Sequence, residues 1–92
     1  MGEVYTEKAK ELLGKGYVLL DVRTKEEYDF DKIQPSINMD VFDDFENKVD
    51  ELDKKDKYLV LCRSGNRSRT ACEIMKEKGF EAHNVEGGLL DW

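Results

Sequence analysis

The chain has 92 residues, a hydrophobic share of 39%, a charged share of 39% and a net charge of −6. This length predicts a single domain that covers residues 1–92. The acidic charge argues against nucleic acids and anionic membranes as partners, and the lack of a long apolar run argues against a membrane-spanning segment.

The N-terminal part predicts two strands and two helices in alternation. Residues 4–5 are a short strand, and Thr6 is the expected N-cap of the first helix. The apolar run Tyr17–Leu20 is continuous, which is typical of a strand covered on both faces. Thr24 and Glu27 have the spacing of a capping box and predict a second, short helix.

The middle of the chain predicts a third strand and a third helix. Ile37–Met39 is another short strand, and Asp40 is the expected N-cap of the helix that follows. One face of this helix carries the apolar residues Phe42, Phe45, Val49 and Leu52, and Phe42 and Phe45 are expected to lie in the core. The charged residues 53–57 then form a connection.

The C-terminal part predicts the central strand and two more elements behind it. The central strand is Leu59–Cys62, and the next helix runs from about Arg67 to Lys78 with Gly79 as its C′ residue. Phe80–Val85 is the last strand. A final helix begins at Leu89 and is cut short where the chain ends.

Strands and helices that alternate in this way predict an α/β fold. We expect a small parallel sheet of about five strands with helices on both faces. Ligands in such folds bind beyond the carboxyl ends of the strands. Cys62 and Asp21 each stand at the end of a predicted strand, so both are expected at that edge.

The segment around Cys62 is the strongest functional signal. The thiol stands between a strand and a helix, where backbone N–H groups and the helix dipole bind anions and lower a thiol pKa. The polar loop after it is Arg63, Ser64, Gly65, Asn66, Arg67 and Ser68. A buried structural cysteine is the alternative, but a simple turn needs no pair of arginines and serines around a thiol. We therefore predict a reactive thiolate in an anion-binding loop.

The other thiol and the single histidine are assigned to less active roles. Cys72 lies on the predicted helix among apolar residues and is expected to pack in the core, with a resolving thiol as the alternative. His83 lies in the last strand, away from the loop in sequence. No secretion signal is present in the sequence, which predicts a cytoplasmic protein with reduced thiols.

Four stretches in order resemble the rhodanese-type sulfurtransferases over roughly residues 17–92. The stretches are Leu19-Leu20-Asp21-Val22-Arg23 with Glu26-Glu27-Tyr28, Ile37-Asn38, the Cys62–Ser68 loop, and Glu86-Gly87-Gly88-Leu89-Leu90-Asp91-Trp92. The resemblance implies a rhodanese-like fold with no cofactor and no metal. It also implies that Asp21 and Arg23 support the site, with Asp21 accepting hydrogen bonds from a neighbouring loop and Arg23 pairing with a carboxylate such as Glu27.

The resemblance implies thiosulfate sulfurtransferase activity through a persulfide on Cys62. The partners would be a small anionic sulfur donor and a thiol or cyanide acceptor. The alternative is a persulfide carrier that exchanges sulfur with a protein donor or acceptor and turns over small molecules poorly. The related Cys-loop phosphatases have five residues between Cys and Arg, whereas Cys62 and Arg67 are separated by four, and this shorter loop suits sulfur better than phosphate.

One segment departs from the family pattern. Many members have Gly-His and Pro-Gly pairs where this chain has Asp31-Lys32 and Gln34-Pro35. This segment borders the pocket in the family. We therefore expect the departures to affect substrate preference and not the fold.

Overall fold

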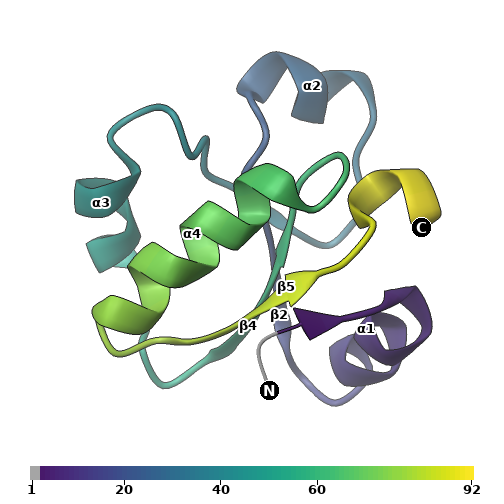
Figure 1. The fold of residues 1–92 in the computed structure, drawn as a ribbon, viewed down its shortest axis with the longest axis horizontal. Helices are drawn as coiled ribbons and strands as arrows, with labels where there is room; N and C mark the ends of the chain where they lie inside the picture. The colour runs from purple at the N-terminus through teal and green to yellow at the C-terminus, as the bar shows by residue number, and fades with distance from the viewer. Residues whose placement is uncertain (1–2) are drawn as a thin grey trace.

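The structure is a computed structural model that describes residues 3–92 (Figure 1). One parallel sheet with the strand order β1-β5-β4-β2-β3 forms its centre. The strands are β1 (Glu3–Val4), β2 (Val18–Asp21), β3 (Ile37–Asn38), β4 (Lys57–Leu61) and β5 (Glu81–Val85). The α/β fold with about five strands is therefore confirmed.

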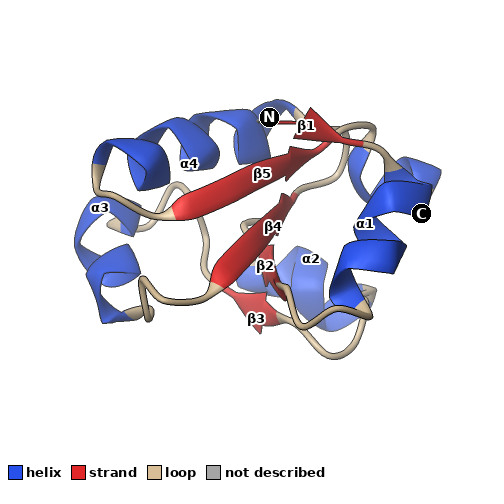
Figure 2. Ribbon diagram, turned by 90° about the horizontal axis from the view of Figure 1, so that it is seen from below, coloured by secondary structure: helices blue, strands red, loops and turns tan. Residues whose placement is uncertain are grey.

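Helices connect the strands and cover both faces of the sheet, as expected from the alternation (Figure 2). The α-helices are α1 (Thr6–Leu13), α2 (Lys25–Phe30), α3 (Phe45–Lys48) and α4 (Asn66–Glu77), and the 3₁₀ helices are η1 (Val49–Glu51) and η2 (Gly88–Asp91). The expected last helix is thus a short 3₁₀ helix. No helix in residues 3–92 is long and apolar enough to cross a membrane.

The core consists of two apolar clusters, one on each face of the sheet. Successive strand residues point to opposite faces, so Leu19 of β2 packs in one cluster and Leu20 in the other. The cluster around Leu20 includes buried residues of α3 and α4, whereas the cluster around Leu19 includes α1 and is flanked by Trp92. Both faces of β2 and β4 are therefore buried, which explains their continuous apolar sequences.

Register brings the ends of β2 and β4 together. Asp21 pairs with Leu61, and the backbone N–H of Val22 donates to the Leu61 carbonyl at 2.8 Å. Cys62 immediately follows Leu61, so the residues after both strands lie at the same edge of the sheet. This is the carboxyl edge where the sequence places Asp21 and Cys62.

The two predicted helix starts in the N-terminal part have different outcomes. The capping box is present, because the Thr24 side chain accepts from the N–H of Glu27 while the Glu27 carboxylate accepts from the N–H of Thr24. The N-cap of α1, however, is Tyr5. Thr6 is the first helical residue, and its hydroxyl donates to the Asp91 carbonyl at 3.1 Å. Thr6 therefore ties the start of α1 to the C-terminal turn.

The third helix begins later than the sequence predicts. Asp40 caps a turn, where its carboxylate accepts from the N–H of Phe42 at 2.9 Å, and the helix starts only at Phe45. Phe45 and Val49 are buried as expected, but the Phe42 side chain is 74% exposed. The prediction that Phe42 belongs to the core is wrong, because the turn places this residue before the helix that would have aligned it with Phe45.

Candidate active site

The polypeptide after β4 wraps around the thiol of Cys62. The Sγ atom accepts a hydrogen bond from the N–H of Gly65 at 3.1 Å and lies 3.3 Å from the hydroxyl of Ser68. Gly65 has φ = 101°, a left-handed conformation that favours glycine, and it lets the chain turn into α4. Cys62 is only 1% exposed, so the loop encloses its sulfur at the start of a helix.

The loop changes the ionisation of Cys62. Burial raises the thiol pKa, but hydrogen bonds from the Ser68 hydroxyl and from the N–H groups of Ser68, Gly65 and Ser64 outweigh this effect and lower the pKa below its ordinary value. The thiolate is stabilised by these donors around the sulfur. This arrangement agrees with the expected activation by loop dipoles.

The six loop residues after Cys62 have different environments. Arg63, Ser64 and Asn66 are exposed, whereas Gly65 and Ser68 are buried. Arg67 is partly buried and both of its terminal nitrogens contact the Glu27 carboxylate, at 2.6 and 2.9 Å. The Arg67 guanidinium is thus held between α4 and α2 by its ion pair with Glu27.

Asp21 and Arg23 form a buried ion pair beside the loop. An Arg23 terminal nitrogen lies 2.7 Å from the Asp21 carboxylate, and the same guanidinium donates to the backbone carbonyls of Asp31 and Glu27. Arg23 pairs with a carboxylate as expected, but with that of Asp21 and not that of Glu27, because Arg67 occupies the Glu27 carboxylate. The expectation that Asp21 accepts hydrogen bonds from a neighbouring loop is wrong, because its carboxylate accepts from the backbone and side chain of Arg23. Arg23 ties the end of β2 to the middle and to the C-terminal end of α2, which indicates a structural role.

The C-terminal segment of residues 88–90 packs against the backbone of Cys62 and Arg63. The N–H groups of Leu89 and Leu90 donate to the carbonyls of Cys62 and Arg63 at 2.9 and 3.1 Å. Gly88 lies so close that a Cβ atom there would be 2.5 Å from both carbonyl oxygens. The Gly-Gly pair that the sequence highlighted therefore lets this segment approach the backbone around the thiol.

Asn84 is a site residue that sequence reasoning missed. It lies in β5, is 1% exposed, and donates from its amide to the Gly65 carbonyl at 3.1 Å while accepting from the Ser68 hydroxyl. The signal in the sequence was a polar side chain inside a predicted buried strand, since such a group needs partners. Asn84 therefore joins β5 to the middle of the thiol loop at Gly65 and to its last residue, Ser68.

An open pocket lies next to the loop. It has a volume of about 430 Å³ and is lined by Arg23, Glu27, Phe30, Asp31, Arg63, Leu89 and Leu90. Arg63 has no carboxylate partner among residues 3–92 and is exposed in this pocket. Of the loop arginines, Arg63 is thus the one that is available to an anion.

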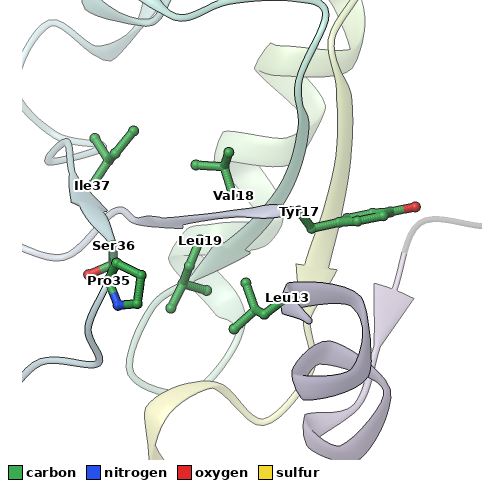
Figure 3. A pocket seen from close by; sticks show the side chains of 7 residues that line it. All are labelled: Leu13, Tyr17, Val18, Leu19, Pro35, Ser36 and Ile37. Carbon is green, nitrogen blue, oxygen red and sulfur yellow. The ribbon is translucent and has the colours of Figure 1, made fainter. Parts of the chain in front are cut away.

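Other features of the chain lie outside this site. Cys72 is buried in the core, and burial raises the pKa of its thiol to about 12. His83 contacts Glu81 at 3.0 Å and packs beside Tyr17. A separate, apolar pocket of about 310 Å³ lies between α1, β2 and the segment before β3 (Figure 3). In residues 3–92 no group of His, Cys, Asp or Glu is arranged to hold a metal ion.

The Glu27–Arg67 pair predicts a specific pH dependence of stability. Hydrogen bonding to Arg67 lowers the pKa of Glu27 from 4.5 to about 2. Burial raises this pKa, and hydrogen bonds from Thr24 lower it further. The stabilisation is fully present above pH 4.5 and is lost as pH falls toward 2. Because the Glu27 side chain is 33% exposed, we expect a contribution of only about 1 kcal/mol.

Urea unfolding across this pH range measures the effect. Glu27→Gln should remove about 1 kcal/mol at neutral pH and flatten the loss of stability in acid. Glu46→Gln is the matched control, because Glu46 is exposed in the first turn of α3 and has no ion pair in the described part of the chain. Equal pH profiles for the two variants would contradict the assigned role of Glu27.

The fold and this loop define a class: α/β proteins that enclose a thiol in hydrogen-bond donors at the carboxyl edge of a parallel sheet. A family model described as a rhodanese-like domain matches residues 5–92, so the chain belongs to the rhodanese-like family. The match covers all the elements from α1 onward.

Relatives by sequence include two Bacillus subtilis proteins. "Putative sulfurtransferase YtwF" is 39% identical over 74 residues, which are 80% of this chain and 71% of that protein. "Putative sulfur carrier protein YrkF" is 36% identical over 75 residues, which are 80% of this chain but only 40% of that protein. The family around this chain thus includes proteins named as sulfurtransferases and as a sulfur carrier.

Solved structures share the whole fold. A rhodanese-related protein from Thermoplasma volcanium has a TM-score of 0.92 and 34% identity, with 100% of this chain and 90% of that chain covered. A rhodanese-like domain protein from Staphylococcus aureus has a TM-score of 0.90 and 29% identity, with 100% and 91% covered. These matches agree with the architecture that the sequence predicts.

Proposed function

We propose that this protein is a sulfurtransferase that carries a sulfane sulfur as a persulfide on Cys62. The observation that carries the proposal is the enclosed Sγ atom, which hydrogen-bond donors surround at the start of α4. The same donors would stabilise the negative charge of a persulfide. The likeness to YtwF, which is named as a sulfurtransferase, supports this assignment.

With thiosulfate as donor, transfer takes two displacements. The Cys62 thiolate attacks the outer sulfur of thiosulfate, the S–S bond of the donor breaks, and sulfite leaves with the electron pair. Cyanide or a thiolate then attacks the outer sulfur of the Cys62 persulfide, and the Cys62 thiolate leaves with the electron pair. The products are thiocyanate or a new persulfide, and the kinetics are ping-pong.

The position of Arg67 also favours sulfur over phosphate. A phosphate-binding loop uses a guanidinium to contact the anion, but both terminal nitrogens of Arg67 contact Glu27. The loop is also shorter by one residue than that of the phosphatase-like relatives. A single sulfur atom with one negative charge fits a loop of this kind better than a tetrahedral dianion.

A persulfide carrier that serves a protein partner is the second candidate function. Two large apolar side chains at the pocket beside the loop favour it, because Phe30 is 93% and Leu90 is 64% exposed. The likeness to YrkF, which is named as a sulfur carrier, also supports it.

Steady-state formation of thiocyanate from thiosulfate and cyanide tests whether the protein is an enzyme. Loading of Cys62 without such turnover would favour the carrier.

Arg63 and Arg67 should have separable roles. Arg63→Ala should raise the KM for thiosulfate about tenfold, and Cys62 should still accept sulfur. The exposed guanidinium attracts the anionic donor, and the variant loses this attraction equally in the ground state and the transition state. Arg67→Ala should reduce loading and lower the free energy of unfolding by about 1–2 kcal/mol, because it leaves Glu27 without its partner.

Donor kinetics and urea unfolding on both variants test these roles. Lys76→Ala is the charge-matched control, since Lys76 is exposed in the last turn of α4, far along the helix from the loop. It should leave KM unchanged. The assignment fails if Arg63→Ala has the KM of the control, or if Arg67→Ala is as stable and as active as the parent.

A further inference from the structure

The hydroxyl of Ser68 lies between two groups that compete for its proton. Its Oγ atom is 3.3 Å from the Sγ of Cys62 and donates to the side-chain oxygen of Asn84. Ser68 is fully buried and Asn84 is 1% exposed, so water does not substitute for either partner. A hydroxyl has one proton and can donate to only one of them at a time.

The surroundings of Asn84 decide which end of its amide faces Ser68. The amide nitrogen donates to the Gly65 carbonyl at 3.1 Å and to the Glu86 carboxylate at 3.2 Å. The reverse orientation would place the amide oxygen against these two acceptors. The oxygen of Asn84 therefore faces Ser68 and can only accept.

We propose that Asn84 is a positioning residue that sets the direction of the Ser68 hydroxyl. When Cys62 is a neutral thiol, its S–H donates to the Ser68 oxygen and the Ser68 proton goes to Asn84. When Cys62 carries an anionic sulfur, the hydroxyl turns and donates to that sulfur. The oxygen of Asn84 is then left buried without a donor.

The consequence is that Asn84 opposes ionisation of Cys62, while the loop donors favour it. The buried side-chain oxygen of Asn84 loses its hydrogen bond when the Ser68 hydroxyl turns, and this loss costs free energy. The cost offsets part of the stabilisation that the Ser68 hydroxyl gives to the thiolate. Asn84 thereby limits how much of the resting protein is in the reactive, easily oxidised form. The inference rests on the proposed function for the identity of the reacting sulfur, but ionisation can be measured without any sulfur transfer.

A double-mutant cycle separates this effect from the anchoring of the loop by Asn84. The variants are Asn84→Ala, Ser68→Ala and the double variant. The measurement is the ultraviolet absorbance of the Cys62 thiolate against pH, as a difference from the matching Cys62→Ser protein. In the Ser68→Ala background, the Asn84 substitution can change the midpoint only through the loss of its contact with the loop at the Gly65 carbonyl. We expect Asn84→Ala to lower the midpoint of thiolate formation in both backgrounds or in the Ser68 background alone. The downward shift should be about one pH unit larger with Ser68 present than in the Ser68→Ala background.

Asn84→Leu provides a second variant of similar size that also lacks the acceptor. It should lower the midpoint, and it should lower it more with Ser68 present than in the Ser68→Ala background. Because leucine fills the volume of the amide, this variant checks that the result with Asn84→Ala does not come from a cavity beside the loop. The proposal is overturned if either substitution shifts the midpoint equally with and without Ser68, or if the extra shift has the opposite sign.

Discussion

Cys62→Ser is expected to reduce sulfur transfer by about three orders of magnitude or more while the fold stays intact. The serine hydroxyl occupies nearly the same volume but stays neutral at physiological pH, and it cannot form a persulfide. Steady-state thiocyanate formation from thiosulfate and cyanide measures the loss. Circular dichroism and thermal unfolding check that the variant folds, which we expect because Cys62 has no covalent partner in the structure.

Cys72→Ser is the matched control for the other thiol. Cys72 is buried in the core, and burial keeps its thiol protonated by raising the pKa to about 12. This variant should keep the transfer activity and lose some stability, because it places a hydroxyl in an apolar cluster. The assignment of the nucleophile would be wrong if Cys72→Ser abolished transfer while Cys62→Ser retained it.

Gly88→Ala is expected to have the second largest effect, on both stability and activity. Gly88 has φ = 58°, and an added Cβ would lie 2.5 Å from the carbonyl oxygens of Cys62 and Arg63. These are backbone atoms of the thiol loop, so they can give way only if the loop moves. We expect a loss of about 2–5 kcal/mol of unfolding free energy, from the left-handed backbone and the close contact together. Sulfur loading of Cys62 should fall in the fraction that stays folded.

Gly79→Ala is the control that separates the effect of the close contact at Gly88 from the effect of a positive φ. Gly79 also has a positive φ, 94°, but a Cβ there would meet no atom within 4 Å. Its substitution should cost only about 1–2 kcal/mol and leave sulfur loading unchanged. Urea unfolding and donor loading of both variants give the comparison. If the two alanine variants were equally stable and equally loadable, close packing of Gly88 on the loop would not support the site.

The architecture could be predicted from the sequence because local patterns and tertiary structure agree. The continuous apolar runs became the buried strands β2 and β4, and the capping box at Thr24 is present. The position of Cys62 between a strand and a helix was enough to predict its place at the carboxyl edge. Each of these features depends on residues close together in the chain.

The partners within the site could not be predicted, because they come from segments far apart in sequence. Glu27 and Arg67 are separated by 40 residues, so nothing local indicated that Arg67, and not Arg23, would take the Glu27 carboxylate. Asn84 was missed for the same reason, since its contacts with Gly65 and Ser68 require the register of β4 and β5. Phe42 shows that helical spacing misleads where a turn delays the start of a helix.

The central claim is that Cys62 carries the transferred sulfur. The most direct measurement is mass spectrometry of the intact protein and its peptides after incubation with thiosulfate or with a small-molecule persulfide, compared with Cys62→Ser and Cys72→Ser. We predict one added sulfur atom on the peptide that contains Cys62, in the parent and in Cys72→Ser, and none in Cys62→Ser. No added sulfur from either donor, or an added sulfur on Cys72, would contradict the account.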